Sequence, residues 1–144
     1  MSKIRFEAQD LRIDLPIPGW YPAQIQDARF CRSACGNRML QVRFALADVD
    51  VSYQRLSEYF VIEGATPFGL VMTRRRLVDL YRATGLDPQP GDEIAARDLV
   101  GRALDVELGH DTWQGQPRLK VLRHRPCAEP AADGFHRTVS RVDP

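Results

Sequence analysis

The sequence predicts an all-β domain with one inserted helix, and three observations predict it. The chain has 144 residues, a length typical of one domain. Five segments alternate apolar and polar residues, as half-buried strands do. One segment with helical spacing falls between the third and the fourth of them. Five strands with a helix at that place give the element order of the OB-fold, a partly open five-stranded Greek-key barrel.

The first strand is expected over residues 20–31, after an extended arm at residues 1–15 and a break that begins at Pro16. Its apolar residues share one face in the first half and have the opposite parity in the second half. They are Tyr21, Ala23 and Ile25, followed by Ala28 and Phe30. A slip of one residue inside a strand predicts a β-bulge, here near Asp27.

A Gly-Asn loop at residues 32–38 leads to the clearest alternation in the chain. The inward residues of this second strand are Leu40, Val42, Phe44 and Leu46. The third strand is expected over residues 51–62, after a turn at residues 48–50. Its inward residues would be Leu56, Phe60 and Ile62, and its outward residues Tyr53, Arg55, Ser57 and Tyr59. This phase also turns Glu58 inward, so a bulge or the opposite phase remains open.

Residues 66–85 are expected to form the helix. Thr66 suits the N-cap, Pro67 the first helical position and Gly85 the left-handed position after the last turn. The apolar residues at helical spacing are Leu70, Leu77, Leu80 and Tyr81. Three consecutive arginines at residues 74–76 cannot share one face of a helix, so we expect them on a solvated surface.

Two more strands follow an acid-rich stretch at residues 87–93 and a single helical turn at residues 95–99. They are expected at residues 102–110 and 118–124, joined by a hairpin loop at residues 110–117. Their inward residues would be Leu104, Val106, Leu108, Leu119 and Val121.

The periodic part of the chain gives the predicted domain boundaries. An OB-fold domain with its N-terminal arm would span residues 1–126, and residues 127–144 would form a flexible C-terminal tail. The N-terminus lacks the apolar core of a signal peptide, and no apolar stretch approaches the ~20 residues that span a bilayer. We therefore expect a cytoplasmic protein with reduced cysteines and no membrane contact. A homo-oligomer remains open.

The net charge of +1 hides an uneven distribution of charge. Residues 28–47 and residues 115–126 each carry four cations and no acid, whereas residues 87–111 carry seven acids and two cations. In an OB-fold, nucleic acid lies across the second and third strands, between the loops that join strands 1–2 and 4–5. The acid-free segments therefore fall where this fold binds nucleic acid.

Cations contact phosphates, and aromatic rings stack on bases without demanding a sequence. The expected phosphate contacts are Arg32, Arg38, Arg43, Arg55, Arg118 and Lys120. The expected stacking residues are Trp113, Tyr53 and Tyr59. Trp20, at the start of the first strand, is expected in the core or at the end of the barrel.

The cysteines allow an alternative. Cys31, Cys35, His124 and Cys127 are ligand types that suit tetrahedral zinc, but their spacing is loose and no metal is predicted. A redox-sensitive pair of the first two also remains open. The His-Asp pair at residues 110–111 has no nucleophile elbow beside it, and no glycine loop for phosphate is present. We therefore predict neither an enzyme nor a cofactor.

Several short motifs occur in order over residues 18–125. They are GWYPAQI at 19–25, Gly36-Asn37 followed by Met39-Leu40, TGLDPQ at 84–89, DLVGR at 98–102 and WQGQPR at 113–118. In this order the chain resembles a family of phage and prophage single-stranded-DNA-binding proteins that formerly carried a domain-of-unknown-function label. The resemblance implies an OB-fold, cytoplasmic binding of single-stranded DNA, and a role in phage replication or recombination beside a recombinase.

The chain departs from that family at its C-terminal end. Members often end in an acidic tail that recruits partner proteins, whereas residues 127–144 set three acids against two arginines. The resemblance therefore does not extend to recruitment by the tail. A second function stays open: an OB-type protein-interaction module, such as a phage scaffold or inhibitor, that binds no nucleic acid.

Overall fold

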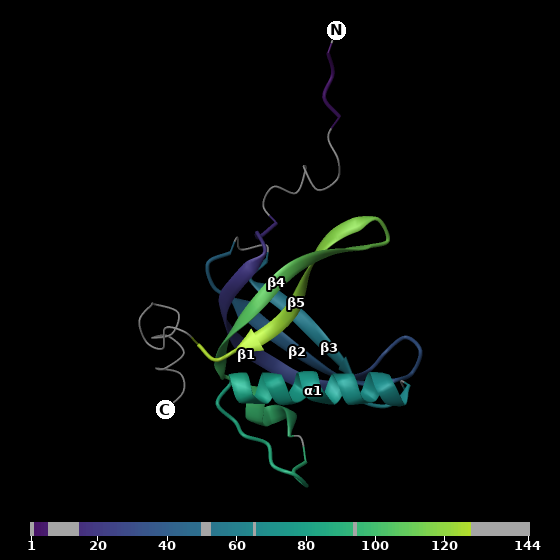
Figure 1. Cartoon of the computed structure of the whole chain (residues 1–144), viewed down its shortest axis with the longest axis vertical. Coiled ribbons are helices and arrows are strands. Elements are labelled where there is room, and N and C mark those ends of the chain that lie inside the picture. The colour runs from purple at the N-terminus through teal and green to yellow at the C-terminus, as the bar shows by residue number, and fades with distance from the viewer. Residues whose placement is uncertain (1, 6–14, 50–52, 65, 94, 128–144) are drawn as a thin grey trace.

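The computed structural model describes residues 2–5, 15–49, 53–64, 66–93 and 95–127. Its elements in chain order are β1 (Gly19–Arg32), β2 (Arg38–Leu46), β3 (Arg55–Val61), α1 (Pro67–Ala83), the 3-10 helix η3 (Ala96–Leu99), β4 (Ala103–Trp113) and β5 (Gln116–Arg125). The strands form one antiparallel sheet in the order β3-β2-β1-β4-β5 (Figure 1). The all-β class and the helix between the third and fourth strands are confirmed. Most of the predicted arm and of the tail lies outside the described residues.

β1 is the central strand and pairs with both of its neighbours. Its register with β2 shifts between Ile25 and Asp27, which confirms the predicted bulge. The bulge changes the parity of the strand, so Ile25 and Ala28 both face the core. The bend lets one long strand pair with β4 through its first half and extend with β2 through its second half.

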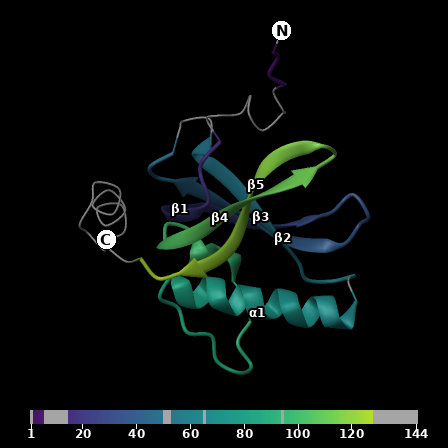
Figure 2. The same cartoon turned by 45° about the horizontal axis from the view of Figure 1, so that its top comes forward.

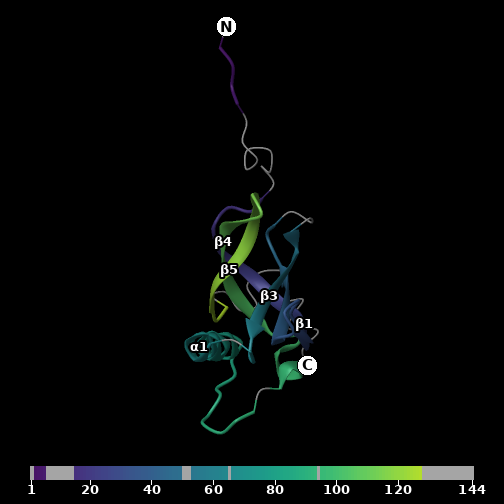
Figure 3. The same cartoon turned by 90° about the vertical axis from the view of Figure 1, so that its right-hand side faces the viewer.

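The inner face of the sheet forms the core, as the alternation predicted. The inward residues of β2 and β4 are buried, namely Leu40, Val42, Phe44, Leu46, Leu104, Val106 and Leu108. α1 lies across one end of the coiled sheet, and Figure 3 views the helix nearly end-on. Its Leu77 and Leu80 belong to the same core. The alternation therefore identified the buried face correctly in both strands.

The sheet does not close into a barrel. Within the described residues β3 and β5 are edge strands that pair with no further strand, so backbone hydrogen bonds do not close the sheet into the predicted five-stranded barrel. Side chains join the two edges instead. Glu58 of β3 accepts a hydrogen bond from His124 Nε2 of β5 and another from Arg76 Nη2 of α1, both at 2.7 Å.

This cluster also decides the phase of the third strand. Glu58 faces inward and is only 7% exposed, as the predicted phase required. A buried carboxylate is costly without partners, and the two bonds to Arg76 and His124 provide them. Arg76 is exposed on α1, as expected, with 45% of its side chain accessible, but its guanidinium also reaches Glu58 and stacks 4.6 Å from the ring centroid of Phe60.

α1 begins and ends where the sequence predicted. The Thr66 hydroxyl accepts a hydrogen bond from the Gly69 amide, and Pro67 occupies the first turn. Gly85 has a φ of +92°, the left-handed conformation that a residue after a helix commonly adopts. The predicted helical turn at residues 95–99 is also present, as η3.

The last hairpin differs from the prediction. The loop expected at residues 110–117 is wrong: β4 continues to Trp113, β5 starts at Gln116, and only Gln114 and Gly115 form the turn. Both have positive φ, which matches the twist of a two-residue hairpin turn. The extension is polar because it projects beyond the core (Figure 1), so apolar alternation could not reveal it.

The bounds of β3 and the parity of β5 also differ from the prediction. β3 is shorter than predicted and spans Arg55–Val61, and residues 50–52 lie outside the described part. In β5 a register shift opposite Glu107 and Leu108 reverses the parity of the strand, so His124 faces inward and Arg123 outward. Among the described residues no helix is both long and apolar enough to cross a membrane.

Candidate nucleic-acid interface

The outer side of the first three strands presents a continuous row of polar residues. In register, Asp27 of β1 lies beside Arg43 of β2, and Arg43 lies beside Ser57 of β3. The next positions on each strand bring Arg29, Gln41 and Tyr59 side by side, and Ala45 beside Arg55. We call this surface the β1–β2–β3 face. Its residues are Asp27, Arg29, Gln41, Arg43, Arg55, Ser57 and Tyr59.

Gln41 sits at the centre of this face and bonds to both neighbouring strands. Its Oε1 accepts a hydrogen bond from Arg29 Nε at 3.4 Å. Its Nε2 donates to Ser57 Oγ at 3.2 Å and to the Tyr59 hydroxyl at 3.3 Å. Tyr59 is 49% exposed. Its side chain is therefore held on the sheet by Gln41 while the ring remains accessible to solvent. An exposed ring held in place is suited to stacking.

The cations of this face differ in their partners. Arg29 bonds to Gln41 and lies 3.8 Å from the Asp27 carboxylate. Arg43 and Arg55 form no hydrogen bond or ion pair with any side chain in the described part of the chain. Since only Asp27 adds a negative charge, the face carries a net excess of cations. A guanidinium group without such a partner can bind a phosphate without first breaking an ion pair.

The β1–β2 hairpin borders the face on one side. Arg32 Nη1 donates to the Gly36 carbonyl at 2.9 Å and so holds the turn together. Arg38 stacks 4.6 Å from the ring centroid of Phe30 and lies 3.6 Å from Glu63. Both predicted phosphate ligands are therefore on this hairpin, but each already has a partner within the protein.

The β4–β5 hairpin borders the opposite edge of the sheet, and both hairpins project toward the same side in Figures 1 and 2. Three of its four cations face acids across the strand pair, and of the two predicted phosphate ligands only Arg118 is among them. Arg118 Nε lies 2.8 Å from Asp111, Arg123 Nε 2.6 Å from Glu107, and Arg125 Nε 3.3 Å from Asp105. Lys120 is exposed and lies opposite Gly109.

Hydrogen bonds from these arginines dominate the acid–base chemistry of the hairpin. The bond from Arg123 lowers the pKa of Glu107, and the bond from Arg118 lowers the pKa of Asp111. The same bonds raise the pKa of each arginine. Exposed pairs of this kind contribute little to stability, but they neutralise most of the positive charge that the sequence places on β5.

The three aromatic residues predicted to stack on bases do not lie on one surface. Tyr59 is on the β1–β2–β3 face, whereas Tyr53 precedes β3 and is half-buried. Trp113 ends β4 at the tip of the hairpin, and its side chain lies outside what the structure describes.

Trp20 was expected in the core or at the end of the barrel, and the first of these alternatives is wrong. The half-buried Trp20 lies on the outer side, opposite Glu107, because the parity that turns Tyr21 inward turns its neighbour outward. The guanidiniums of Arg125 and Arg123 stack 4.2 and 5.4 Å from its ring. The indole is thus covered by cations of β5.

The four residues considered for zinc are spread over the molecule. Cys31 and Cys35 belong to the β1–β2 hairpin, and neither they nor Cys127 form a disulfide within the part of the chain that the structure describes. His124 has its Nε2 bonded to Glu58 in the core. Within the described residues no group of three or more His, Cys, Asp or Glu side chains is arranged to hold a metal ion.

Sequence reasoning missed Arg29, Gln41 and Ser57 as members of the site. The alternation of β2 already turned Gln41 outward, which was the available signal. The alternation could not supply the register that brings Arg29 and Tyr59 to either side of Gln41.

No protein-family model matches the chain, and no curated protein matches it significantly.

Proposed function

We propose that this chain is a sequence-tolerant single-stranded-DNA-binding protein of the OB type. The observation that carries the proposal is the β1–β2–β3 face, where Arg43 and Arg55 lack partners among the described residues and the exposed Tyr59 is fixed by Gln41. Cations at this position bind phosphates, and the ring stacks on a base. The resemblance noted in the sequence points to the same activity.

The topology supports the OB assignment. The sheet order β3-β2-β1-β4-β5 would become a five-stranded barrel if β3 and β5 paired, and the bonds of Glu58 hold these two edges together. OB-folds are partly open barrels that bind oligonucleotides across strands 2 and 3 between the two flanking loops. The β1–β2 and β4–β5 hairpins would occupy the positions of those loops.

The strand would cross the β1–β2–β3 face and be flanked by the hairpins. Arg43 and Arg55 would contact phosphates first, because Arg32, Arg38 and Arg118 would have to exchange an existing partner for a phosphate. Lys120 and Trp113 would add a cation and a ring from the β4–β5 hairpin. This chemistry reads no base edges, so the binding is expected to tolerate any sequence. Within a cell it would serve phage DNA replication or recombination in the cytoplasm, beside a recombinase or replication protein.

The test is a titration of fluorescein-labelled oligo-dT with the full chain at several salt concentrations. We expect binding at low salt that weakens as salt rises, with a log–log slope of about −0.7 for each phosphate contacted. Lack of binding at low salt would refute the proposal. It would favour the second candidate, a protein-interaction module, which the neutralised surface of β5 also fits.

A further inference from the structure

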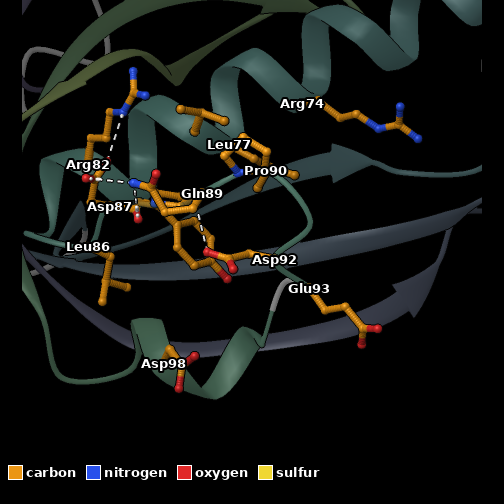
Figure 4. A pocket seen from close by; sticks show the side chains of 13 residues that line it. Arg74, Leu77, Arg82, Leu86, Asp87, Gln89, Pro90, Asp92, Glu93 and Asp98 are labelled. Carbon is orange, nitrogen blue, oxygen red and sulfur yellow. Dashed lines mark hydrogen bonds and ion pairs between the residues drawn. The ribbon is translucent and has the colours of Figure 1, made fainter.

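A groove of about 750 Å³ lies between the second half of α1, residues 86–93 and η3 (Figure 4). Its size is within the range of sites that bind ligands. Side chains from α1 and from the following segment give it an apolar floor, namely Leu77, Val78, Tyr81, Leu86, Pro88 and Pro90. The groove is formed by other elements than the β1–β2–β3 face, so the two surfaces can be occupied independently.

The rim of the groove is acidic. Four carboxylates line it against two guanidiniums: Asp87, Asp92, Glu93 and Asp98 against Arg74 and Arg82. We call it the acidic groove. Figure 4 shows two of the carboxylates bonded within the rim: Asp87 is 3.9 Å from Arg82, and Asp92 accepts a hydrogen bond from the Gln89 amide at 2.7 Å.

The other two carboxylates of the rim are available to a ligand. Glu93 and Asp98 accept no side-chain hydrogen bond and form no ion pair with any residue that the structure describes. Burial, with the charge of Asp98 as the smaller cause, raises the pKa of Tyr81 to about 12. With four carboxylates against two guanidiniums, the lining of the groove carries a net negative charge. Such a groove favours an occupant that carries both cations and apolar side chains, and it disfavours nucleic acid.

We propose that the acidic groove binds residues 134–142 of the same chain. This stretch, GFHRTVSRV, contains no acid and combines both required kinds of side chain. Its cations are Arg137 and Arg141, and its large apolar residues are Phe135, Val139 and Val142. It lies outside the described residues, so the proposal rests on the chemistry of the groove and of the sequence.

The stretch can reach the groove. The described chain ends at Cys127, just after β5, and Figures 1 and 2 show the end of β5 beside the end of α1 that leads into residues 86–93. The seven residues between Cys127 and Phe135 can span up to about 25 Å when extended. Attachment at this point gives the stretch a high effective concentration at the groove. Phe135 would occupy the apolar floor, and Arg137 would face Glu93 and Asp98.

Amide hydrogen exchange of the full chain tests the proposal. In the parent protein at low salt we expect residues 86–93 and residues 134–142 to be protected together. Phe135→Ser should increase exchange at residues 86–93 by about threefold or more, because the occupant no longer fills the floor. Arg137→Glu should act in the same direction, and its combination with Glu93→Lys should restore protection by reversing both charges. Glu129→Gln, in the same tail but outside the stretch, is the matched control and should change nothing.

Three outcomes would overturn the proposal. Exchange at residues 86–93 that is the same in the parent and in Phe135→Ser would show that the groove is empty. If Arg137→Glu combined with Glu93→Lys does not restore protection, Arg137 does not face Glu93 in the groove. Protection that rises with protein concentration, together with a dimer in sedimentation velocity, would assign the stretch to a second copy. Oligo-dT affinity measured on the same variants keeps this test separate from that of the DNA-binding proposal.

Discussion

The β1–β2–β3 face and the outer side of the β4–β5 hairpin are both rich in arginine, yet they differ in charge. On the hairpin, Arg118, Arg123 and Arg125 each face an acid of β4 at 2.6–3.3 Å. On the face, Arg55 lies opposite Ala45, and Arg43 lies between Asp27 and Ser57, yet neither guanidinium forms an ion pair with any residue that the structure describes. The comparison shows that the partners of each side chain, and not the local number of cations, decide where a sheet presents positive charge.

Removing both unpaired cations of the face is expected to have the largest effect. Arg43→Gln with Arg55→Gln should weaken oligo-dT binding about 100-fold at low salt, because a hydrogen bond to a charged group contributes about 1.5–3 kcal/mol. The log–log salt slope should fall by about 1.4, for two phosphate contacts. The matched control is Arg118→Gln with Arg123→Gln on the hairpin. Equal losses in the two double variants would remove the distinction between the two regions.

The next largest effect is expected from the ring of Tyr59. Tyr59→Ala should cost about 1–3 kcal/mol of binding free energy if one base stacks on it, while the salt slope stays the same. Tyr59→Phe keeps the ring and loses only the bond to Gln41, so it should retain most of the affinity. Fluorescence titration with oligo-dT distinguishes the two. A salt slope that falls with Tyr59→Ala would contradict stacking.

Trp113 provides the corresponding test at the tip of the hairpin. Trp113→Ala should lower affinity within the same range of about 1–3 kcal/mol if the indole also stacks on a base. The readout is the loss of tryptophan quenching by oligo-dT, with Trp20 as the internal reference because its ring is covered by Arg125 and Arg123. Unchanged affinity would confine stacking to the β1–β2–β3 face.

A smaller effect is expected from Gln41. Gln41→Ala removes three hydrogen bonds of an exposed network and releases Tyr59 and Arg29 from their fixed positions. We expect a loss of about 0.5–1.5 kcal/mol in DNA affinity, the usual net contribution of a hydrogen bond. Circular dichroism should show an unchanged fold. An affinity equal to that of the parent would mean that Tyr59 needs no support from Gln41.

The smallest effect is expected from pH acting on the hairpin pairs. Asp111 and Glu107 have lowered pKa values in the folded protein, so their contribution to stability is present above the ordinary values of 3.8 and 4.5 and is lost as the pH falls through the lowered ones. Carboxyl NMR titration should show the pKa of Asp111 moving up in Arg118→Gln, with the pKa of Glu107 unchanged. The DNA affinity at neutral pH should change by less than about twofold, since the pair is exposed.

Local patterns in the sequence determined much of this protein. The alternation of Leu40, Val42, Phe44 and Leu46 identified β2 and its inner face, the parity slip identified the bulge after Ile25, and the Thr66-Pro67 pair marked the start of α1. These features depend on residues close together in the chain. Backbone preference and the burial of one face are sufficient to specify them.

The tertiary structure alone decided what each charge does. Glu58 could be assigned inward only because Arg76 and His124, from two distant elements, provide its partners. The segment with β5 carried four cations and no acid, yet the acids that pair with three of those cations are in β4. A Coulomb interaction depends on distance in space, and the strand register that sets this distance is fixed by the packing of the whole sheet. The sequence therefore determined the elements and their buried faces, and only the folded sheet decided which cations remain free for a ligand.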